Sequence, residues 1–186
     1  MAIEFMTTNQ WNDSLWRLIG PVYQEAFPRG AKTETILRSM LDRGIAWLHA
    51  VLEDGRASAM AVTGIVVEGT NKVLIIDYMA VRRDMRGRSV GGQFLDKIRE
   101  WAQQEQGVNT IVIEVEAEDT EANAYRMCFW EKNGFRPTAY VHKYIWVPEP
   151  YLAMVLPLND SDTIPEDGKT LFRYITKFHE KAYRRR

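Results

Sequence analysis

The chain has 186 residues, a length that suits one domain with a substantial hydrophobic core. Its 46% apolar and 26% charged residues are ordinary for a globular protein, and the net charge of −1 argues against nucleic acid or an anionic membrane as the main partner. One cysteine, Cys128, excludes an internal disulfide and a cysteine-based metal cluster. We expect a cytoplasmic location, because the N-terminus lacks the regions of a signal peptide and no apolar run reaches the roughly 20 residues that span a bilayer.

The first half of the chain predicts a short strand, two helices and an antiparallel meander. Apolar residues recur at helical spacing from Trp11 until Pro28 and Gly30 end the pattern, and Glu53-Asp54-Gly55 is a hairpin signal. The expected elements are a strand at 3–7, helices starting at 11 and spanning 33–42, and strands at 46–52, 58–67 and 73–81.

The second half predicts a crossover, two more strands and a last helix. A helix with an apolar face from Phe94 to Ala102 ends at Gly107, and a second helix is closed by Asn133-Gly134. The other expected elements are a strand at 110–116, a helix at 121–132, strands near 140–146 and 152–158, and a helix at 171–182. We therefore expect an α/β (α+β) fold, with a domain at 1–158 and a polar linker and amphipathic C-terminal helix at 159–186.

The stretch that follows the strand at 73–81 is rich in arginine and glycine. Arg82, Arg83, Arg86 and Arg88 fall within seven residues, and a helix begins directly after them. A strand that leads through a glycine turn into a helix N-terminus presents backbone N–H groups to an anion, most often a phosphate. Arginines strengthen this prediction because they form bidentate bonds to phosphate oxygens.

Two motifs in the right order resemble the GNAT superfamily of N-acetyltransferases, from about Ile3 to Leu158. They are Arg86-Gly87-Arg88-Ser89-Val90-Gly91 and Trp130-Glu131-Lys132-Asn133-Gly134-Phe135. The resemblance implies a mixed, mostly antiparallel sheet flanked by helices, here with an additional C-terminal helix, and acetyl-CoA as co-substrate without a metal. The cofactor-binding residues that it implies are Met79, Ala80, Val81, Arg86, Gly87, Arg88, Ser89, Val90, Gly91, Gly92, Asn123 and Arg126.

The sequence departs from the family pattern at two positions. Ser89 replaces the first motif glycine, and we expect it to cap the helix or donate its hydroxyl to phosphate. Trp130 stands where many family members have a tyrosine that protonates the leaving thiolate, and an indole N–H is not a usable acid. Tyr125, on the same expected helix, is the nearest candidate for this acid, and a packing residue is the favoured alternative at this position.

Transfer of an acetyl group to an amine also requires a group that accepts a proton from the amine. Asp77 matches a glutamate of polyamine-acetylating relatives, and Glu114 matches a glutamate that ribosomal-protein-acetylating relatives use through water. We expect the strands that carry Asp77 and Glu114 to diverge near the thioester, so that both side chains can face one cleft. The alternatives are an edge or buried carboxylate at position 77 that is satisfied by the backbone, and a solvated strand face at position 114 that is shared with Glu116.

The acceptor is the least defined part of the hypothesis. Carboxylates gather from Glu114 to Glu121 and would attract a cationic amine, which leaves a small-molecule amine, a peptide N-terminus or a protein lysine open. Trp47, Tyr144 and Trp146 are candidates for an acceptor pocket, Cys128 reads as a core residue, and the three histidines do not form a metal set.

The hypothesis is thus an acetyl-CoA-dependent N-acetyltransferase that transfers acetyl directly to an amine in a ternary complex. The alternatives are a non-catalytic acyl-CoA-binding or regulatory module on the same fold and a nucleotide-phosphate binder that uses the same turn. The sequence leaves open whether the C-terminal helix packs on the domain or on a second copy of the chain. A homodimer is therefore one of the two expected arrangements.

Overall fold

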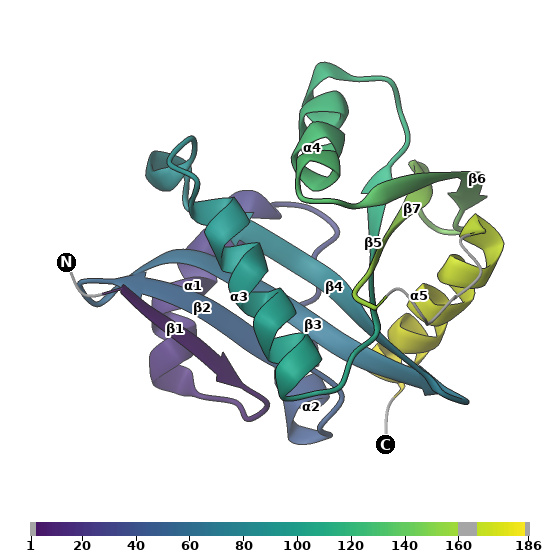
Figure 1. Cartoon of the computed structure of the whole chain (residues 1–186). Helices are drawn as coiled ribbons and strands as arrows, with labels where there is room; N and C mark the ends of the chain where they lie inside the picture. The colour runs from purple at the N-terminus through teal and green to yellow at the C-terminus, as the bar shows by residue number, and fades with distance from the viewer. Residues whose placement is uncertain (1–2, 160–166, 185–186) are drawn as a thin grey trace. The chain divides into compact units, whose positions relative to one another are not determined.

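The computed structural model describes residues 3–159 and 167–184, and its elements follow the predicted order. The elements are β1 (Ile3–Thr8), α1 (Asp13–Ala26), α2 (Glu34–Asp42), β2 (Trp47–Glu53), β3 (Arg56–Glu68), β4 (Asn71–Val81), the 3-10 helix η1 (Arg83–Met85), α3 (Val90–Gln104), β5 (Thr110–Glu116), α4 (Glu121–Lys132), β6 (Arg136–Lys143), β7 (Pro150–Pro157) and α5 (Gly168–Tyr183). The strands form one sheet in the order β1-β2-β3-β4-β5-β7-β6. The predicted mixed, mostly antiparallel sheet with an additional C-terminal helix is confirmed (Figure 1).

The chain divides into two compact units that share the long strands β3 and β4. The first unit comprises Met1–Gly64, Ile76–Gln106 and Lys181–Arg186, and the second comprises Ile65–Ile75 and Gly107–Glu180. Most of the linker predicted between 159 and 168 lies outside the described residues. The proposed domain boundary at residue 158 stays a prediction.

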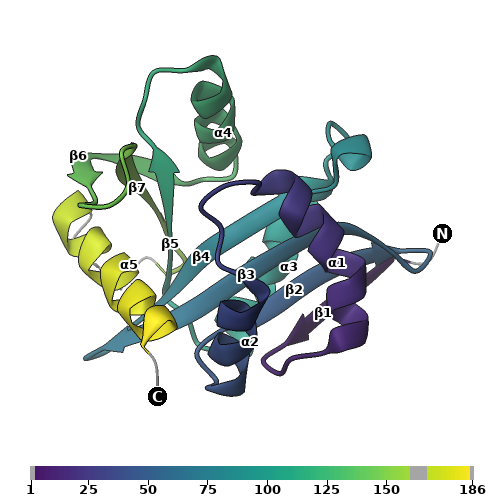
Figure 2. The same cartoon turned by 180° about the vertical axis from the view of Figure 1, so that it is seen from behind.

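In the first unit, β1 pairs with β2 and β2 with β3, both antiparallel, with a register irregularity at Val51/Leu52. Helices α1 and α2 cover one face of these strands, and α3 covers the other (Figures 1 and 2). The face of α3 predicted from the sequence is buried, as the apolar spacing requires: Phe94, Leu95, Ile98, Trp101 and Ala102 are at most 6% exposed. This packing fixes the position of the turn that precedes α3.

A fully buried histidine lies in the core of the first unit. His49 is 0% exposed, its Nδ1 lies 2.8 Å from the Thr7 hydroxyl, and its Nε2 lies 2.8 Å from the Thr63 hydroxyl. The ring also packs edge-on against Trp101. Burial lowers the pKa of His49 to about 3, because the imidazolium has no compensating charge there.

His49 should make the protein sensitive to acid. The unfolded chain takes up a proton near its ordinary pKa of ~6.5, whereas the folded state does not, so stability falls by about 1.4 kcal/mol per pH unit as the pH drops from that value toward the folded pKa. We expect His49→Gln to flatten the stability-versus-pH slope between about pH 4 and 6 by one proton, measured by urea unfolding. His142→Gln is the matched control, and an unchanged slope in His49→Gln would contradict the assignment.

In the second unit, β5 pairs in parallel with β4 from Val73 to Ile75 and antiparallel with β7 along its whole length. Helix α5 buries one apolar face, made of Leu171, Phe172, Ile175 and Phe178. Its polar side is tied to β3, since Lys177 and Arg173 pair with Glu68 at 2.8 and 3.4 Å. The hydrogen bond from Lys177 lowers the pKa of Glu68. The C-terminal helix is thus an integral part of this unit.

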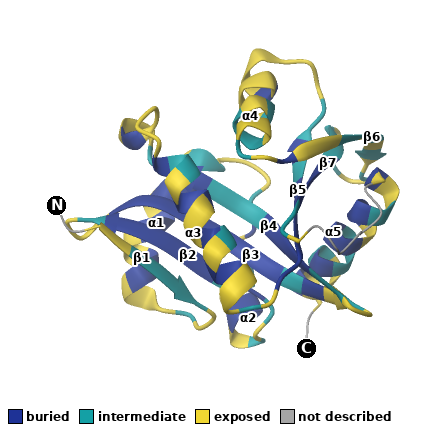
Figure 3. Cartoon of the chain, in the orientation of Figure 1, coloured by how far each residue is buried: buried dark blue, intermediate teal, exposed yellow. Residues whose placement is uncertain are grey.

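Two local predictions were wrong in the second unit. The strand expected at 140–146 runs from Arg136 to Lys143, because the chain enters the sheet directly after the positive-φ Gly134, and Ile145 and Trp146 are instead exposed in the following turn at 94% and 80%. Cys128, expected in the core, is exposed. Helix α4 lacks a periodic apolar face and is mostly exposed (Figure 3). Its buried residue is Asn123.

Candidate functional site

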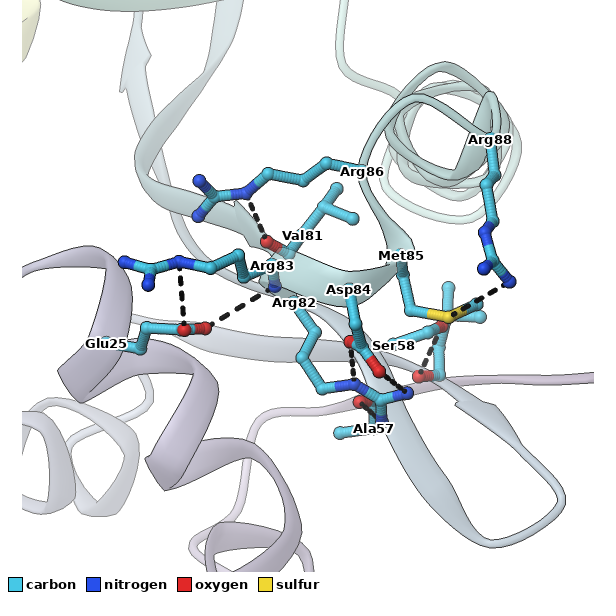
Figure 4. A network of polar contacts seen from close by, with 11 residues as sticks. Glu25, Ala57, Ser58, Val81, Arg82, Arg83, Asp84, Met85, Arg86 and Arg88 are labelled. Carbon is cyan, nitrogen blue, oxygen red and sulfur yellow. Dashed lines mark hydrogen bonds and ion pairs between the residues drawn. The ribbon is translucent and has the colours of Figure 1, made fainter.

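The arginine-rich turn between β4 and α3 is organised by two of its own arginines. Arg82 donates to the Ala57 carbonyl at 2.7 Å and pairs with Asp84 at 2.6 Å, which lowers the pKa of the Asp84 carboxyl. Arg83 lies 3.4 Å from Glu25 of α1. Figure 4 shows both side chains directed toward these partners. The shape of the turn is therefore fixed by contacts with the body of the first unit.

The other two arginines of the turn are exposed. Arg86 folds back so that its Nε donates to the Val81 carbonyl at the end of β4, at 3.0 Å, and Arg88 lies 4.0 Å from the Met85 sulfur (Figure 4). These guanidinium groups keep donors available to an anion, since neither forms an ion pair among the described residues.

Helix α3 begins with three backbone donors that have no intrahelical acceptor. The first helical bond runs from Gln93 N–H to the Ser89 carbonyl, which leaves the N–H groups of Val90, Gly91 and Gly92 beyond the reach of the helix ladder. Ser89 itself has φ +62°, in the left-handed region, and its side chain makes no capping bond. The expectation that the Ser89 side chain caps the helix is therefore wrong, because the backbone there has the left-handed conformation that a glycine adopts easily and not the extended one of a capping serine.

Asp77 is locked in a buried ion pair within the first unit. Both carboxylate oxygens accept from Lys32 Nζ, at 2.9 and 2.8 Å, and the two side chains are 4% and 2% exposed. Both carboxylate oxygens are engaged by the same ammonium group and shielded from solvent, which indicates a structural role for Asp77. Asp77 is thus buried, as the alternative reading of the sequence expected, but its partner is the Lys32 side chain and not the backbone.

The backbone of Lys32 also forms hydrogen bonds with two tyrosines of the first unit. Its backbone N–H donates to the Tyr78 hydroxyl at 3.0 Å, and its carbonyl accepts from the Tyr23 hydroxyl at 2.8 Å. Burial by itself lowers the pKa of the Lys32 ammonium, but the Asp77 carboxylate together with Tyr78 and Tyr183 outweighs this effect, so the pKa lies above its ordinary value. Burial also raises the pKa values of Tyr23 and Tyr78. At neutral pH Lys32 therefore stays protonated and the two tyrosines stay neutral, which is consistent with a structural cluster.

Glu114, in contrast, lies between two side chains that both reach its carboxylate. The Tyr144 hydroxyl donates to Oε2 at 2.6 Å, and His179 Nε2 lies 3.1 Å from Oε1. The Glu114 side chain is 23% exposed, so the carboxylate is oriented by neighbours and still accessible to solvent. A short charge-assisted bond of this kind fixes a carboxylate more firmly than a neutral hydrogen bond does.

Aromatic side chains surround this arrangement within the second unit. Tyr144 packs against His142 and Tyr151, and His142 stacks on Phe172 of α5 with ring centroids 4.3 Å apart. Burial, followed by the nearby carboxylates of Glu116 and Glu114, raises the pKa of Tyr151 to about 12. The surroundings of Glu114 are therefore apolar in packing and negative in charge, which favours a cationic group over an anion.

Helix α4 carries three of the predicted site residues, Asn123, Tyr125 and Arg126. Thr120 caps the helix by accepting from the Asn123 N–H at 3.2 Å, so Asn123 is not the cap. The buried Asn123 amide instead donates to the Glu118 carbonyl and accepts from Arg126 at 2.8 Å. Tyr125 is 74% exposed. The ring of Trp130, in place of the family tyrosine, packs edge-on against Phe135.

The sequence did not reveal His179 or the role of Tyr144. Tyr144 was grouped with Trp47 and Trp146 as a pocket candidate, but Trp47 packs on Trp101 in the first unit, and Trp146 is exposed. Nothing in the spacing relates position 179 to position 114, which are 65 residues apart. Only the docking of α5 brings them together.

A metal-binding cluster and a membrane-spanning helix are both absent from the described residues. In residues 3–159 and 167–184, no group of three or more histidine, cysteine, aspartate or glutamate side chains is arranged to hold a metal ion. Within the same ranges, none of the helices has the length and apolar character needed to cross a bilayer.

The fold is that of acetyltransferases of known structure. It matches an acetyltransferase from Desulfovibrio desulfuricans (TM-score 0.66, 16% identity, 85% of this chain and 100% of the other) and the ribosomal-protein-S18-alanine N-acetyltransferase of Escherichia coli (0.64, 18%, 87% and 100%). It also matches NAA60 of Arabidopsis thaliana in complex with acetyl-CoA (0.67, 14%, 85% and 99%). A comparison with curated protein sequences gives no significant match.

The sequence itself agrees with this fold. The sequence model of the acetyltransferase (GNAT) family matches residues 12–135, which include the turn before α3, β5 and α4. The chain belongs to this family, and the family resemblance predicted from the two motifs is confirmed. Tyr144 and His179 lie outside the matched residues.

Proposed function

We propose that the protein is an acetyl-CoA-dependent N-acetyltransferase that transfers acetyl directly to an amine. The observation that carries this proposal is Glu114, an accessible carboxylate oriented by Tyr144 and His179 in a chain of the GNAT family. An amine must be neutral to attack a thioester, and a positioned carboxylate removes its proton.

The cofactor role belongs to the turn and the first residues of α3. The N–H groups from Val90 to Gly92, which have no acceptor within the helix, and the exposed Arg86 and Arg88 suit the pyrophosphate of CoA, and the helix dipole adds favourable potential. Met79 to Val81 are proposed to pair with the pantetheine arm, with Asn123 and Arg126 as further contacts. The bond from Arg86 to the Val81 carbonyl links the two parts of this proposed binding segment.

The proposed chemistry is a direct transfer. Glu114 accepts a proton from the ammonium group, directly or through water, and the neutral amine attacks the thioester carbonyl. The C–S bond then breaks, the attacking nitrogen releases its second proton to solvent to give the amide, and CoA leaves as a thiolate that takes up one proton. Tyr125 remains the proposed donor of that proton, with water as the alternative, because Trp130 cannot supply it.

The acceptor is proposed to be a cationic amine on a small molecule or a peptide. The carboxylates near Tyr151 support a positively charged acceptor. Two similar folds support different acceptors: the Escherichia coli relative is named for the alanine of a ribosomal protein, and another structure, 11% identical, is an aminoglycoside acetyltransferase. Neither nucleic acid nor a membrane is proposed as a partner, while a homodimer and a cytoplasmic location remain proposals.

The test is release of CoA from acetyl-CoA in the presence of a panel of amines and peptides, followed by mass spectrometry. We expect CoA release that depends on the amine, together with a mass gain of one acetyl group on the acceptor. Tight acetyl-CoA binding without turnover across the whole panel would instead support a non-catalytic acyl-CoA-binding module. Tighter binding of ATP than of CoA would refute both readings.

A substitution at the start of α3 should abolish cofactor binding. In Gly91→Glu, a carboxylate takes the place proposed for the pyrophosphate, and we expect at least a tenfold loss of acetyl-CoA affinity by calorimetry, because two anions then compete for the same donors. The matched control is Gln104→Glu, which adds the same charge to the same helix about 20 Å away along its axis. Equal affinities in the two variants would contradict the proposed pyrophosphate site.

A further inference from the structure

Helix α5 lies beyond the residues that the family model covers, yet it reaches the carboxylate of Glu114. His179 Nε2 lies 3.1 Å from Glu114 Oε1, and the His179 side chain is 22% exposed. The match to the family model ends at residue 135, so the family model does not cover this contact.

The helix is anchored firmly enough to place a side chain with accuracy. Leu171, Ile175 and Phe178 are at most 1% exposed, and the ion pairs of Lys177 and Arg173 with Glu68 fix its polar side. His179 follows the buried Phe178 and lies one helical turn after Ile175, so the packing of these two residues sets its position along the helix. The packing of the helix therefore sets the position of the imidazole relative to Glu114.

The same helix also supports the second donor to Glu114. Phe172 stacks on His142 at 4.3 Å with an interplanar angle of 17°, and His142 packs edge-on against Tyr144 at 4.6 Å. Tyr144 in turn donates to Glu114 Oε2 at 2.6 Å. Each carboxylate oxygen thus has one donor, and both donors depend on α5.

We propose that His179 is a positioning residue for Glu114, and that α5 completes the active site rather than merely stabilising the fold. This inference rests on the proposed function, in which Glu114 accepts the proton of the amine. With Oε1 and Oε2 each engaged by one donor, the carboxylate keeps its remaining lone pairs in a fixed direction for the amine or a bridging water. The imidazole acts as an N–H donor and does not contact the reacting atoms.

The activity test compares two replacements of His179. His179→Leu removes the donor, and we expect kcat to fall about tenfold while KM for acetyl-CoA stays unchanged. His179→Gln keeps an N–H donor at similar reach, and we expect kcat within about threefold of the original. Equal kcat in His179→Leu and the original protein would overturn the proposal, as would a His179→Gln variant as slow as His179→Leu. If His179→Leu fails to fold, His179→Asn, whose amide is too short to reach, replaces it.

A second readout does not depend on turnover. The chain has three histidines, so the imidazole signals of His179 can be followed by NMR in ¹⁵N-histidine-labelled protein. We expect these signals to move in Glu114→Gln and to stay in Glu180→Gln, which removes a charge next to His179 in sequence. Unmoved signals in Glu114→Gln would overturn the contact. Moved signals in a protein that acetylates no amine would refute the proposed function while leaving the contact between α5 and β5 supported.

Discussion

Glu114→Gln should lower kcat/KM for the amine by about 10²–10³-fold with acetyl-CoA affinity unchanged. The amide keeps the shape of the side chain and an acceptor for Tyr144 or His179, but it cannot take up a proton, and general base catalysis typically contributes a factor of this size. Steady-state kinetics at saturating acetyl-CoA, with binding by calorimetry, measures the two effects separately.

The matched control for this variant is Glu4→Gln, which makes the same change at an exposed position of β1. We expect it to behave as the original protein does. A Glu114→Gln variant with full activity would remove Glu114 from the mechanism and leave proton transfer to another group or to solvent.

Lys32→Met should destabilise the protein by about 3–5 kcal/mol, because it leaves the Asp77 carboxylate buried without its counter-charge. The double variant Lys32→Met/Asp77→Asn removes both charges at nearly constant volume, so we expect it to recover most of this loss. Chemical denaturation of the single and double variants measures the free energy of unfolding.

The same pair of variants decides between the two carboxylates predicted from the sequence. If Asp77 is structural, the folded double variant keeps its activity within a few-fold. Loss of turnover in a double variant that folds normally would identify Asp77 as the proton acceptor and would contradict the role proposed for Glu114. Recovery of stability without loss of turnover supports both assignments at once.

Several elements were predictable because their signals are local. The apolar spacing of α3, the alternation of β5 and the Asn133-Gly134 end of α4 each depend on a few neighbouring residues, and the structure has all three where they were predicted. The same signals misplaced β6 and Cys128. An apolar run that ends in a turn resembles a strand, and a helix without a periodic face gives no indication of which residues it buries.

For the candidate site, the sequence predicted the binding turn but not the choice between the two carboxylates. The turn from Arg86 to Gly92 is a contiguous motif, so its likeness to a phosphate-binding turn follows from the chain itself. For Asp77 and Glu114, the sequence supplied two equivalent carboxylates and no means of choosing. The choice depends on partners 45 residues away at Lys32 and 30 and 65 residues away at Tyr144 and His179.

The sequence by itself therefore determined the family, the order of elements and the motif that is proposed to bind acetyl-CoA, since these are written in short stretches of chain. Only the tertiary structure decided which carboxylate is neutralised by a buried lysine and which is held accessible by a tyrosine and a histidine. The physical reason is that the charge state and orientation of a side chain depend on the groups that folding brings within about 3 Å of it, and distance along the chain carries no record of them.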